Sequence, residues 1–216
     1  MKKKDIKDTK LLIFDWSGTI SDDRKAVQTA FNRVAIEIGL KPIEDLRSWL
    51  KKSVREFENQ YSEQLYKTKS PEEIRQLYFR HFSTLREEGI KPTVYKDALE
   101  ALTTMKNKGK KLIVVSHHPH KSLVEEAEEY GLTKHFDEIL GSIPVKTDEI
   151  IKVCKDMMID VEKAVYVGDM VNDIKSAKKA KVISVALTQG YHDKKTLLRE
   201  KPDYLLRKLS DLVNLL

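Results

Sequence analysis

Five side chains able to do chemistry stand at the ends of apolar runs or at the starts of helical patterns. They are Asp15, Ser116, Lys146, Asp169 and Asp173. A carboxylate can act as a nucleophile that forms a covalent intermediate, and further carboxylates can hold Mg²⁺, which prefers oxygen ligands. A metal ion and an ammonium group together neutralise charge on a transferring phosphoryl group. These residue types therefore indicate phosphoryl-transfer chemistry, provided that the fold brings them together.

The residues that follow Asp15 and Ser116 could bind the phosphate itself. Hydroxyl groups and the backbone N–H groups of a glycine-containing turn can bind phosphate oxygens. We therefore assign Trp16, Gly18 and Thr19 to substrate binding, with the Trp16 ring packing against the core or an overlying lid. His117 is expected to line the same pocket.

Apolar runs of strand length alternate with helical patterns over most of the chain. The predicted strands are 10–15, 111–116, 137–140, 164–167 and 182–186. The helical patterns between them are 95–108, 119–130, 147–158 and 172–179. Strands that are apolar throughout and alternate with helices predict a parallel sheet covered on both faces. Ligands of such sheets bind beyond the carboxyl ends of the strands, so the candidate groups should meet at one edge.

A helical block interrupts this alternation directly after the first strand. Ser70 and Glu73 form a capping-box pattern that begins a helix, and Gly89 ends it. No strand pattern is present between the first strand and Gly89. We therefore predict an α/β fold, with a doubly wound, Rossmann-like parallel-sheet core and an inserted all-helical cap. The predicted core is residues 1–20 and 92–216, and the predicted cap is residues 21–91.

The composition narrows the class of protein. The 216 residues are 40% hydrophobic and 34% charged, which is typical of a soluble globular protein, and no apolar run is long enough to span a membrane. The net charge is +6, but lysines and glutamates are interspersed, so we expect a solvated surface and no nucleic-acid partner. Cys154 is the single cysteine, which excludes an internal disulfide and favours the cytoplasm. The sequence does not predict the oligomeric state.

The order and spacing of the motifs resemble those of the haloacid dehalogenase superfamily. Asp15 to Thr19 resembles its first motif, Ser116 its second, Lys146 its third, and Gly168 to Asp173 its fourth. The resemblance covers the whole predicted core, whereas the helical block resembles the family's caps only in position and helicity. It implies a Mg²⁺-dependent, phosphatase-like hydrolase.

The resemblance implies one role for each of these residues. Asp15 is the nucleophile and a metal ligand, and Asp169 and the main-chain carbonyl of Ser17 also bind the metal. Asp173, with Asn172, holds the metal's waters or Lys146. Lys146 pairs with Asp15 and the phosphoryl group, Ser116 donates to a phosphate oxygen, and Thr19 supports the loop.

Ser17 departs from the family pattern, because phosphatases of the superfamily usually carry a second aspartate there as general acid. That function contributes about 10² to 10⁴ in rate. Three accounts remain open. In the first, a different acid acts, either His117 or His118. In the second, the reaction is carbon–phosphorus cleavage, as in the similar phosphonoacetaldehyde hydrolases, with Lys51 or Lys52 forming a Schiff base. In the third, the protein binds phosphorylated ligands or partners with little turnover.

The function that we predict is a phosphatase acting on a small phosphorylated metabolite through an aspartyl-phosphate on Asp15. The histidines of residues 117–120 suggest zinc only weakly, because neighbours in a strand–helix turn point in different directions. Cys154 lies in an apolar helical pattern and is expected to be core rather than reactive.

Overall fold

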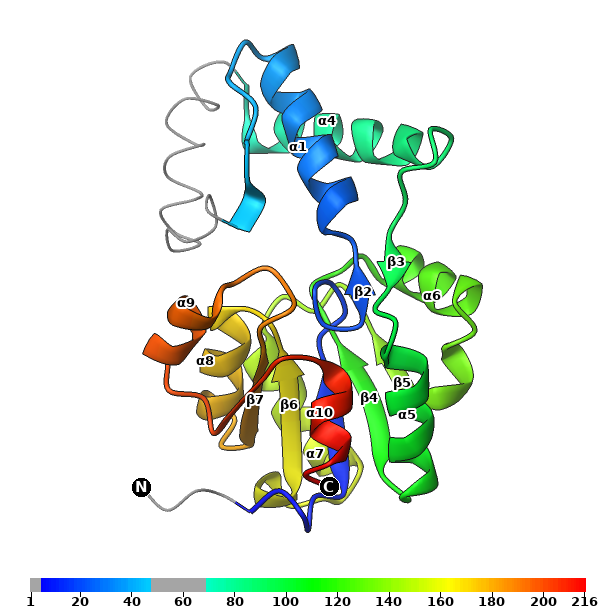
Figure 1. Cartoon of the computed structure of the whole chain (residues 1–216), viewed down its shortest axis with the longest axis vertical. Helices are drawn as coiled ribbons and strands as arrows, with labels where there is room; N and C mark the ends of the chain where they lie inside the picture. Colours follow the sequence, from blue (N-terminus) through cyan, green and yellow to red (C-terminus); the bar gives the residue numbers. More distant parts are fainter. Residues whose placement is uncertain (1–4, 48–68) are drawn as a thin grey trace. The chain divides into compact units, whose positions relative to one another are not determined.

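A computed structural model of the chain describes residues 5–47 and 69–216. The chain divides into two compact units, Met1–Ser21 with Val94–Leu216, and Asp22–Thr93 (Figure 1). Within the described ranges, no helix has both the length and the apolar character that crossing a bilayer requires. The two candidate Schiff-base lysines, Lys51 and Lys52, lie outside the described residues.

The larger unit is built on a six-stranded parallel sheet. Its strands are β1 (Leu11–Phe14), β4 (Lys111–Val115), β5 (Glu138–Leu140), β6 (Ala164–Gly168), β7 (Ile183–Leu187) and β8 (Tyr204–Leu206). They lie in the order β5-β4-β1-β6-β7-β8, and every neighbouring pair is parallel. In the middle of the sheet, Ile13 pairs with Ile113 on one side and Tyr166 on the other. The carboxyl ends of β1, β4 and β6 therefore lie side by side.

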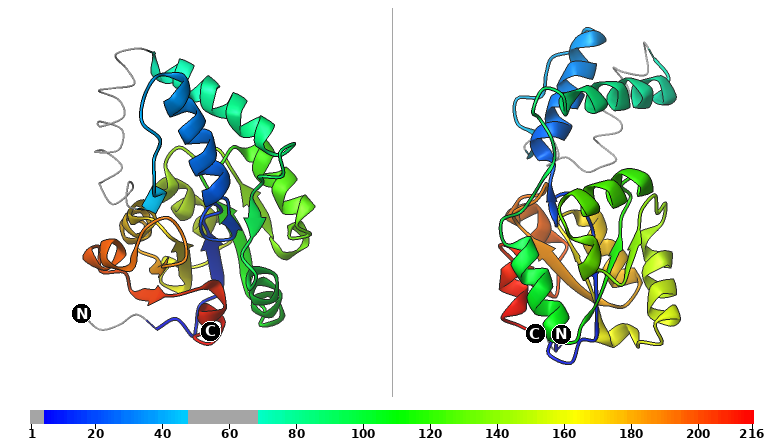
Figure 2. Two further views of the ribbon diagram at one scale, coloured as in Figure 1. Left: turned by 45° about the horizontal axis from the view of Figure 1, so that its top comes forward. Right: turned by 90° about the vertical axis from the view of Figure 1, so that its right-hand side faces the viewer.

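Helices cover both faces of this sheet. They are α5 (Ala98–Asn107), α6 (His120–Glu129), α7 (Lys146–Asp156), α8 (Val171–Lys179), α9 (Lys194–Arg199) and α10 (Leu209–Val213). Because side chains alternate along a strand, Leu12 and Phe14 share a core with α5, α6 and α10, whereas Leu11 and Ile13 share a second core with α7 and α8. The right-hand view of Figure 2 shows α5 and α10 on one side of the sheet and α7 on the other. The predicted α/β fold is confirmed.

The end of the chain holds elements that the sequence pattern did not predict. These are β8 and the short helices α9 and α10, and two 3₁₀ turns, η1 (Thr133–His135) and η2 (Val161–Lys163), lie elsewhere in the unit. The three residues of β8 are all half-buried, so the strand is too short and too mixed to give a periodic signal. A long-range contact positions it: the Asp203 carboxylate accepts from the backbone N–H and hydroxyl of Ser184 on β7, at 2.8 and 2.7 Å.

Two helices of the smaller unit lie wholly within the described residues, α1 (Arg24–Glu37) and α4 (Pro71–Leu85). They pack through a small cluster of Ala26, Ala30 and Leu85. The predicted capping box is present at the start of α4, where Ser70 Oγ accepts from the Glu73 backbone and the Glu73 carboxylate accepts from the Ser70 backbone. Two short strands that were not predicted, β2 (Ser21–Asp22) and β3 (Thr93–Val94), pair with each other at the boundaries of this unit.

Candidate active site

Asp15 stands immediately after β1, with its carboxylate held from two directions. The hydroxyl of Ser116, which follows β4, donates to Asp15 Oδ1 at 2.8 Å. The ammonium group of Lys146, the first residue of α7, lies 2.8 Å from the same oxygen. All three side chains are buried, and both partners lie more than a hundred residues from Asp15 in the sequence. The structure therefore brings together three of the residues that the sequence singled out.

Asp173 holds Lys146 from the other side. The Lys146 ammonium lies 2.7 Å from Asp173 Oδ1, while Asp173 Oδ2 accepts from the backbone N–H groups of Asp169 and Met170 at 3.1 and 2.9 Å. Gly168 permits this approach, because a Cβ there would lie 2.3 Å from the Asp173 Cγ. Asp173 thus fixes both the lysine and the turn that carries Asp169.

Asp169 is fully buried beside β1. Its Oδ1 accepts from the Thr19 hydroxyl at 3.1 Å, and its Oδ2 accepts from the Tyr191 backbone N–H at 2.6 Å. Two glycines leave room for this carboxylate: a Cβ on Gly18 or Gly190 would lie 2.3 or 2.1 Å from Asp169 Oδ2. Gly18 also has a φ of +73°, a conformation that favours glycine. The glycine in the first motif is therefore explained by the packing around Asp169.

The charges of this cluster perturb one another. Burial raises the pKa of Asp169 well above its usual range, and the nearby carboxylates of Asp173 and Asp15 raise it further. Burial also raises the pKa of Asp173, although Lys146 acts against it. For Lys146, burial acts to lower the pKa, but Asp15 and Asp173 outweigh it and raise the pKa well above the usual value. The ammonium form of Lys146 is thus held firmly between two acids.

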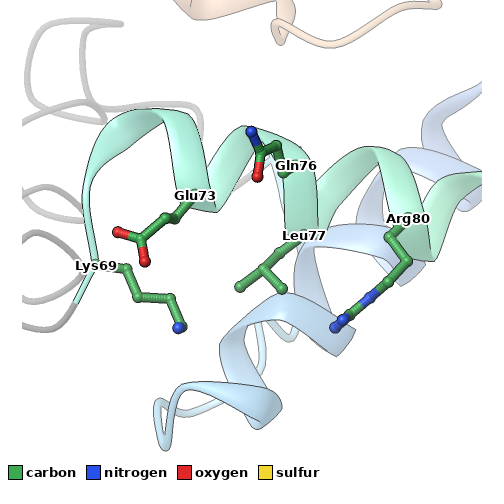
Figure 3. A pocket seen from close by; sticks show the side chains of 5 residues that line it. All are labelled: Lys69, Glu73, Gln76, Leu77 and Arg80. Atoms are coloured by element: carbon green, nitrogen blue, oxygen red, sulfur yellow. The ribbon is translucent and has the colours of Figure 1, made fainter.

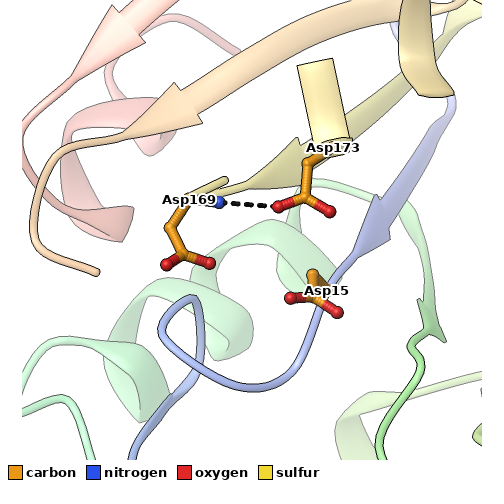
Figure 4. Close-up of side chains that lie close together, drawn as sticks. All are labelled: Asp15, Asp169 and Asp173. Atoms are coloured by element: carbon orange, nitrogen blue, oxygen red, sulfur yellow. Dashed lines mark hydrogen bonds between the residues drawn. The ribbon is translucent and has the colours of Figure 1, made fainter. Parts of the chain in front are cut away.

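The donor set fits a hard divalent cation. Oxygens of Asp15, Asp169 and Asp173 all lie within 4.8 Å of one another, and this is a group of carboxylates with no sulfur or nitrogen ligand. Figure 4 shows Asp15 beyond the end of β1, facing Asp169 and Asp173. Oxygen ligands of this kind suit Mg²⁺, and a cation here would offset the repulsion that raises the pKa of Asp169. The residues present therefore fit the metal that the sequence motifs imply.

Ser17 lies on the loop between Asp15 and Thr19, and its side chain is half-buried. Its hydroxyl is 3.2 Å from Nδ1 of His118, which lies in the segment between β4 and α6. No contact joins Ser17 Oγ to the carboxylate cluster among the hydrogen bonds of the described residues. The position at which the family pattern usually has a second aspartate is thus filled by a serine that contacts an imidazole.

Comparison with known proteins decides the family. A family model for haloacid dehalogenase-like hydrolases matches residues 12–187, which is most of the chain. The chain belongs to this family. The match covers Asp15, Ser116, Lys146 and the segment from Gly168 to Asp173.

Relatives of this haloacid dehalogenase-like hydrolase carry phosphatase names. A phosphoglycolate phosphatase of Psychrobacter arcticus is 26% identical over 97% of this chain and 96% of its own length. One from Pseudomonas fluorescens is 23% identical over 94% of this chain and 78% of its own. In a crystal structure, a predicted phosphoglycolate phosphatase from Haemophilus somnus has the same fold, with a TM-score of 0.79 at 22% identity, covering 97% of this chain and 98% of its own. The chain is therefore a phosphatase-like hydrolase of the family.

Other residues that the sequence singled out lie outside the carboxylate cluster of this hydrolase. Trp16 is fully buried and belongs to the sheet core, as the packing interpretation expected. His117 is exposed; its Nδ1 contacts the Ile143 carbonyl, and its Nε2 lies 3.4 Å from the exposed Asn172. Burial raises the pKa of the Cys154 thiol to about 11, so this side chain is a protonated core residue.

Sequence reasoning missed one acidic residue near the loop after β1. Glu126 is buried on α6, and its Oε2 accepts from the indole N–H of Trp16 at 2.7 Å. The signal was available, because Leu123 and Ala127 are buried on the same helix and Glu126 lies on that inward-facing stripe. Two further residues, Gly190 and Tyr191, contact Asp169 from a loop with no recognisable motif.

A surface pocket of about 340 Å³ lies in the smaller unit, on α4. It is lined by Lys69, Glu73, Gln76, Leu77 and Arg80, which Figure 3 shows along one side of the helix. Arg80 is already paired with Glu37, and Glu73 is engaged in the helix cap. We therefore assign the chemistry to the carboxylate cluster of the larger unit and not to this pocket.

Proposed function

We propose that the protein is a Mg²⁺-dependent phosphatase that acts on a small phosphorylated metabolite through an aspartyl-phosphate on Asp15. The observation that carries the proposal is the contact of Asp15 with Lys146, beside the carboxylates of Asp169 and Asp173. A nucleophile, a cation and a group of oxygen ligands at one sheet edge are the parts that phosphoryl transfer needs.

Each residue of the cluster has a distinct part in the proposed reaction. Both the Ser116 hydroxyl and the Lys146 ammonium contact Asp15 Oδ1, so we assign the attack on phosphorus to Asp15 Oδ2. Lys146, charged and held by Asp173, balances the negative charge of the phosphoryl group. We assign to the Ser116 hydroxyl, which contacts Asp15, a hydrogen bond to one of the phosphoryl oxygens. Positioning by Asp173 thus serves the chemistry through Lys146.

Asp15 and Asp169, with the Ser17 carbonyl, are the proposed holders of the metal, and Asp173 completes the site. Mg²⁺, when bound, would supply positive charge to the phosphoryl oxygens. Without it, burial and mutual repulsion disfavour the charged form of Asp169, as its raised pKa indicates. The chain's own residues therefore favour a cation at this place.

We assign substrate selection to the unit Asp22–Thr93, acting as a cap. It is a separate compact unit whose two boundaries are the short strands β2 and β3. Closing units of this kind exclude water and choose the substrate in many enzymes. The names of the relatives make 2-phosphoglycolate the first metabolite to test.

The test is phosphate release from 2-phosphoglycolate and from 4-nitrophenyl phosphate, with Mg²⁺ and with EDTA. We expect Mg²⁺-dependent release by the native chain and a fall of at least about 10³-fold in Asp15→Asn, which lacks the nucleophile. Asp148→Asn is the matched control, because Asp148 is exposed in the first turn of α7 and outside the cluster. Asp15→Asn retaining activity would contradict the proposal.

Two further measurements test the other two accounts, carbon–phosphorus cleavage and binding without turnover. A lysine adduct trapped by borohydride with phosphonoacetaldehyde, without ester hydrolysis, would favour carbon–phosphorus cleavage. Phosphate binding without turnover of any substrate would favour a binding protein. The names of the relatives favour the phosphatase over both accounts. Lys51 and Lys52 lie outside the described residues.

A further inference from the structure

A chain of polar contacts runs from the loop after β1 to helix α6, apart from the carboxylate cluster. The hydroxyl of Ser17 lies 3.2 Å from His118 Nδ1. On the other side of the ring, His118 Nε2 lies 3.4 Å from Glu126 Oε1, an ion-pair contact when the imidazole is protonated. A hydroxyl, an imidazole and a carboxylate are thus arranged in sequence.

The carboxylate at the inner end of this chain is fixed in place. The second oxygen of Glu126 accepts from the indole N–H of Trp16 at 2.7 Å, and only 8% of Glu126 is exposed. Trp16 is fully buried, with its ring edge-to-face against Phe136 at 6.4 Å between centroids. A buried carboxyl group is costly unless it is paired. Here Oε2 has a hydrogen bond from Trp16, and Oε1 lies 3.4 Å from His118 Nε2. The fold therefore holds the Glu126 carboxyl group beside His118.

The outer end of this chain of contacts lies on the loop directly after Asp15. Ser17 is two residues after Asp15, and the turn that carries it is closed by the Gly18 N–H donating to the Ser21 carbonyl at 2.8 Å. Its side chain is only half-buried, unlike that of Asp15. The Ser17 hydroxyl is therefore on the loop next to the nucleophile and is partly open to a ligand.

When Asp15 cleaves a phosphate ester, the leaving oxygen needs a proton. Attack by the carboxylate forms an oxygen–phosphorus bond and breaks the bond to the leaving oxygen, which departs as an alkoxide unless it is protonated. Lys146 is held between two carboxylates and is paired with the nucleophile itself. Within the described residues, the cluster around Asp15 thus contains no group assigned to this transfer.

We infer that Ser17, His118 and Glu126 form the proton relay for the leaving oxygen, an inference that rests on the proposed phosphatase function. As the ester bond breaks, the Ser17 hydroxyl gives its proton to the leaving oxygen and takes one from His118 Nδ1, which leaves the imidazole neutral. When water attacks the aspartyl-phosphate, its proton returns through Ser17 to His118. The Glu126 side chain, which lies on the Nε2 side of the ring, orients the imidazole, while Asp15 is regenerated.

His118 suits the role of proton carrier better than its neighbour His117. His117 is exposed, and its two ring nitrogens are directed to the Ile143 carbonyl and toward Asn172. The side chain of His118 is 12% exposed, and the ring is held between a hydroxyl and a carboxylate. Orientation of an imidazole by a carboxylate is the arrangement that makes it an effective proton carrier.

The test is the dependence of rate on the leaving group. A series of para-substituted phenyl phosphates, from 4-nitro to 4-methoxy, keeps size similar while the need for a proton increases. We expect His118→Asn to lower kcat/KM by about 10²-fold or more for the 4-methoxy ester and by less than about 10-fold for the 4-nitro ester. His120→Asn is the matched control, because His120 is exposed at the start of α6 and outside the relay.

Two further variants keep the inference falsifiable if His118→Asn folds poorly. Glu126→Gln and Ser17→Ala should show the same leaving-group dependence, each with unfolding by urea measured alongside. Adding Ser17→Asp to His118→Asn should restore hydrolysis of the 4-methoxy ester, because a carboxyl group can then donate the proton directly.

The outcomes separate the relay from the function on which it rests. An equal loss on every ester in the three relay variants, or no loss, would overturn the relay while leaving the phosphatase in place. A native chain that hydrolyses none of the esters would overturn the phosphatase and the relay together. Only a loss that grows with the basicity of the leaving group, absent in His120→Asn, supports the relay.

Discussion

The same kinds of charged side chain are buried in one region of the molecule, the carboxylate cluster of the larger unit, and exposed in another, the α1–α4 surface of the smaller unit. In the larger unit, Lys146 is buried between Asp15 and Asp173, with 4% of its side chain exposed. In the smaller unit, Glu37 on α1 pairs with Arg80 and His81 on α4, and its side chain is 36% exposed. A second surface pair, Arg33 with Glu88, lies in the same unit.

The difference in burial between these two sets of charges indicates a different role for each. Exposed pairs are screened by water and salt and add little to stability. Buried charges lose hydration, so a buried pair is weak evidence of stabilisation, but breaking one is costly. Burying the charges of Asp15, Lys146 and Asp173 therefore costs the larger unit folding free energy, and a catalytic role explains why they are kept. In the smaller unit, the exposed charges pair across the surface of helices α1 and α4.

Replacing Lys146 should give the largest effect, because Lys146→Met leaves two buried carboxylates without their cation. We expect a loss of about 3–5 kcal/mol in the free energy of unfolding, measured by urea denaturation in EDTA, together with loss of phosphatase activity. Mg²⁺ should reduce the loss of stability, since it supplies positive charge to the same carboxylates.

The control for this change is Lys152→Met on the same helix. Lys152 pairs with Glu149 at 3.0 Å, but 63% of its side chain is exposed, so no measurable change is expected. Equal destabilisation by the two variants would refute the contrast between buried and exposed charges.

An intermediate effect is expected from filling the space beside Asp169. In Gly190→Ala, the new Cβ would start 2.1 Å from Asp169 Oδ2 and must displace that carboxylate. We expect the Mg²⁺ concentration for half-maximal activity to rise at least about 10-fold and the free energy of unfolding to fall by about 1–3 kcal/mol. A titration of activity with Mg²⁺ and a urea curve measure the two.

Gly39→Ala in the smaller unit is the matched control for this substitution. Gly39 has a φ of +77°, and a Cβ on this residue would have nothing within 4 Å, so the change costs backbone strain of about 1–2 kcal/mol without touching the site. Its Mg²⁺ dependence should equal that of the native chain. A shift as large as that of Gly190→Ala would show that the effect is not local to Asp169.

The smallest effect should come from the surface cluster and should depend on pH. Hydrogen bonds from Arg80 and then His81 lower the pKa of Glu37 from its usual value of 4.5. Because the folded state holds the charged form, this contribution is present above about pH 4.5 and is lost as the pH falls through the lower folded-state pKa. Glu37→Gln should therefore be slightly less stable than the native chain at pH 7, and the difference should vanish in acid.

Urea denaturation at several pH values between about 3 and 7 measures this trend. Glu44→Gln is a control on an exposed glutamate outside the α1–α4 ion pairs. A deficit in Glu37→Gln that grows as the pH falls would contradict the assigned sign.

Particular residues show how far the sequence could lead. Uniformly apolar runs predicted β1, β4 and β6, because strands buried on both faces leave little room for polar residues. The Ser70 capping box was readable because its contacts are local. The inward-facing stripe of α6 could have pointed to Glu126, but its contact could not be predicted, because its partner Trp16 lies 110 residues away. β8 was missed for a related reason, since Asp203 positions it through Ser184 on another strand.

The sequence by itself determined the order of strands and helices, the family motifs and the residue types available for phosphoryl transfer, because these follow from local periodicity and short spacings. Only the tertiary structure decided that Asp173 pairs with Lys146 and that Gly190 leaves space for the Asp169 carboxylate. It also decided that Ser17 contacts the His118 imidazole, which lies beside Glu126. Those contacts join residues distant in the chain, and their geometry depends on the parallel sheet that sets β1 between β4 and β6.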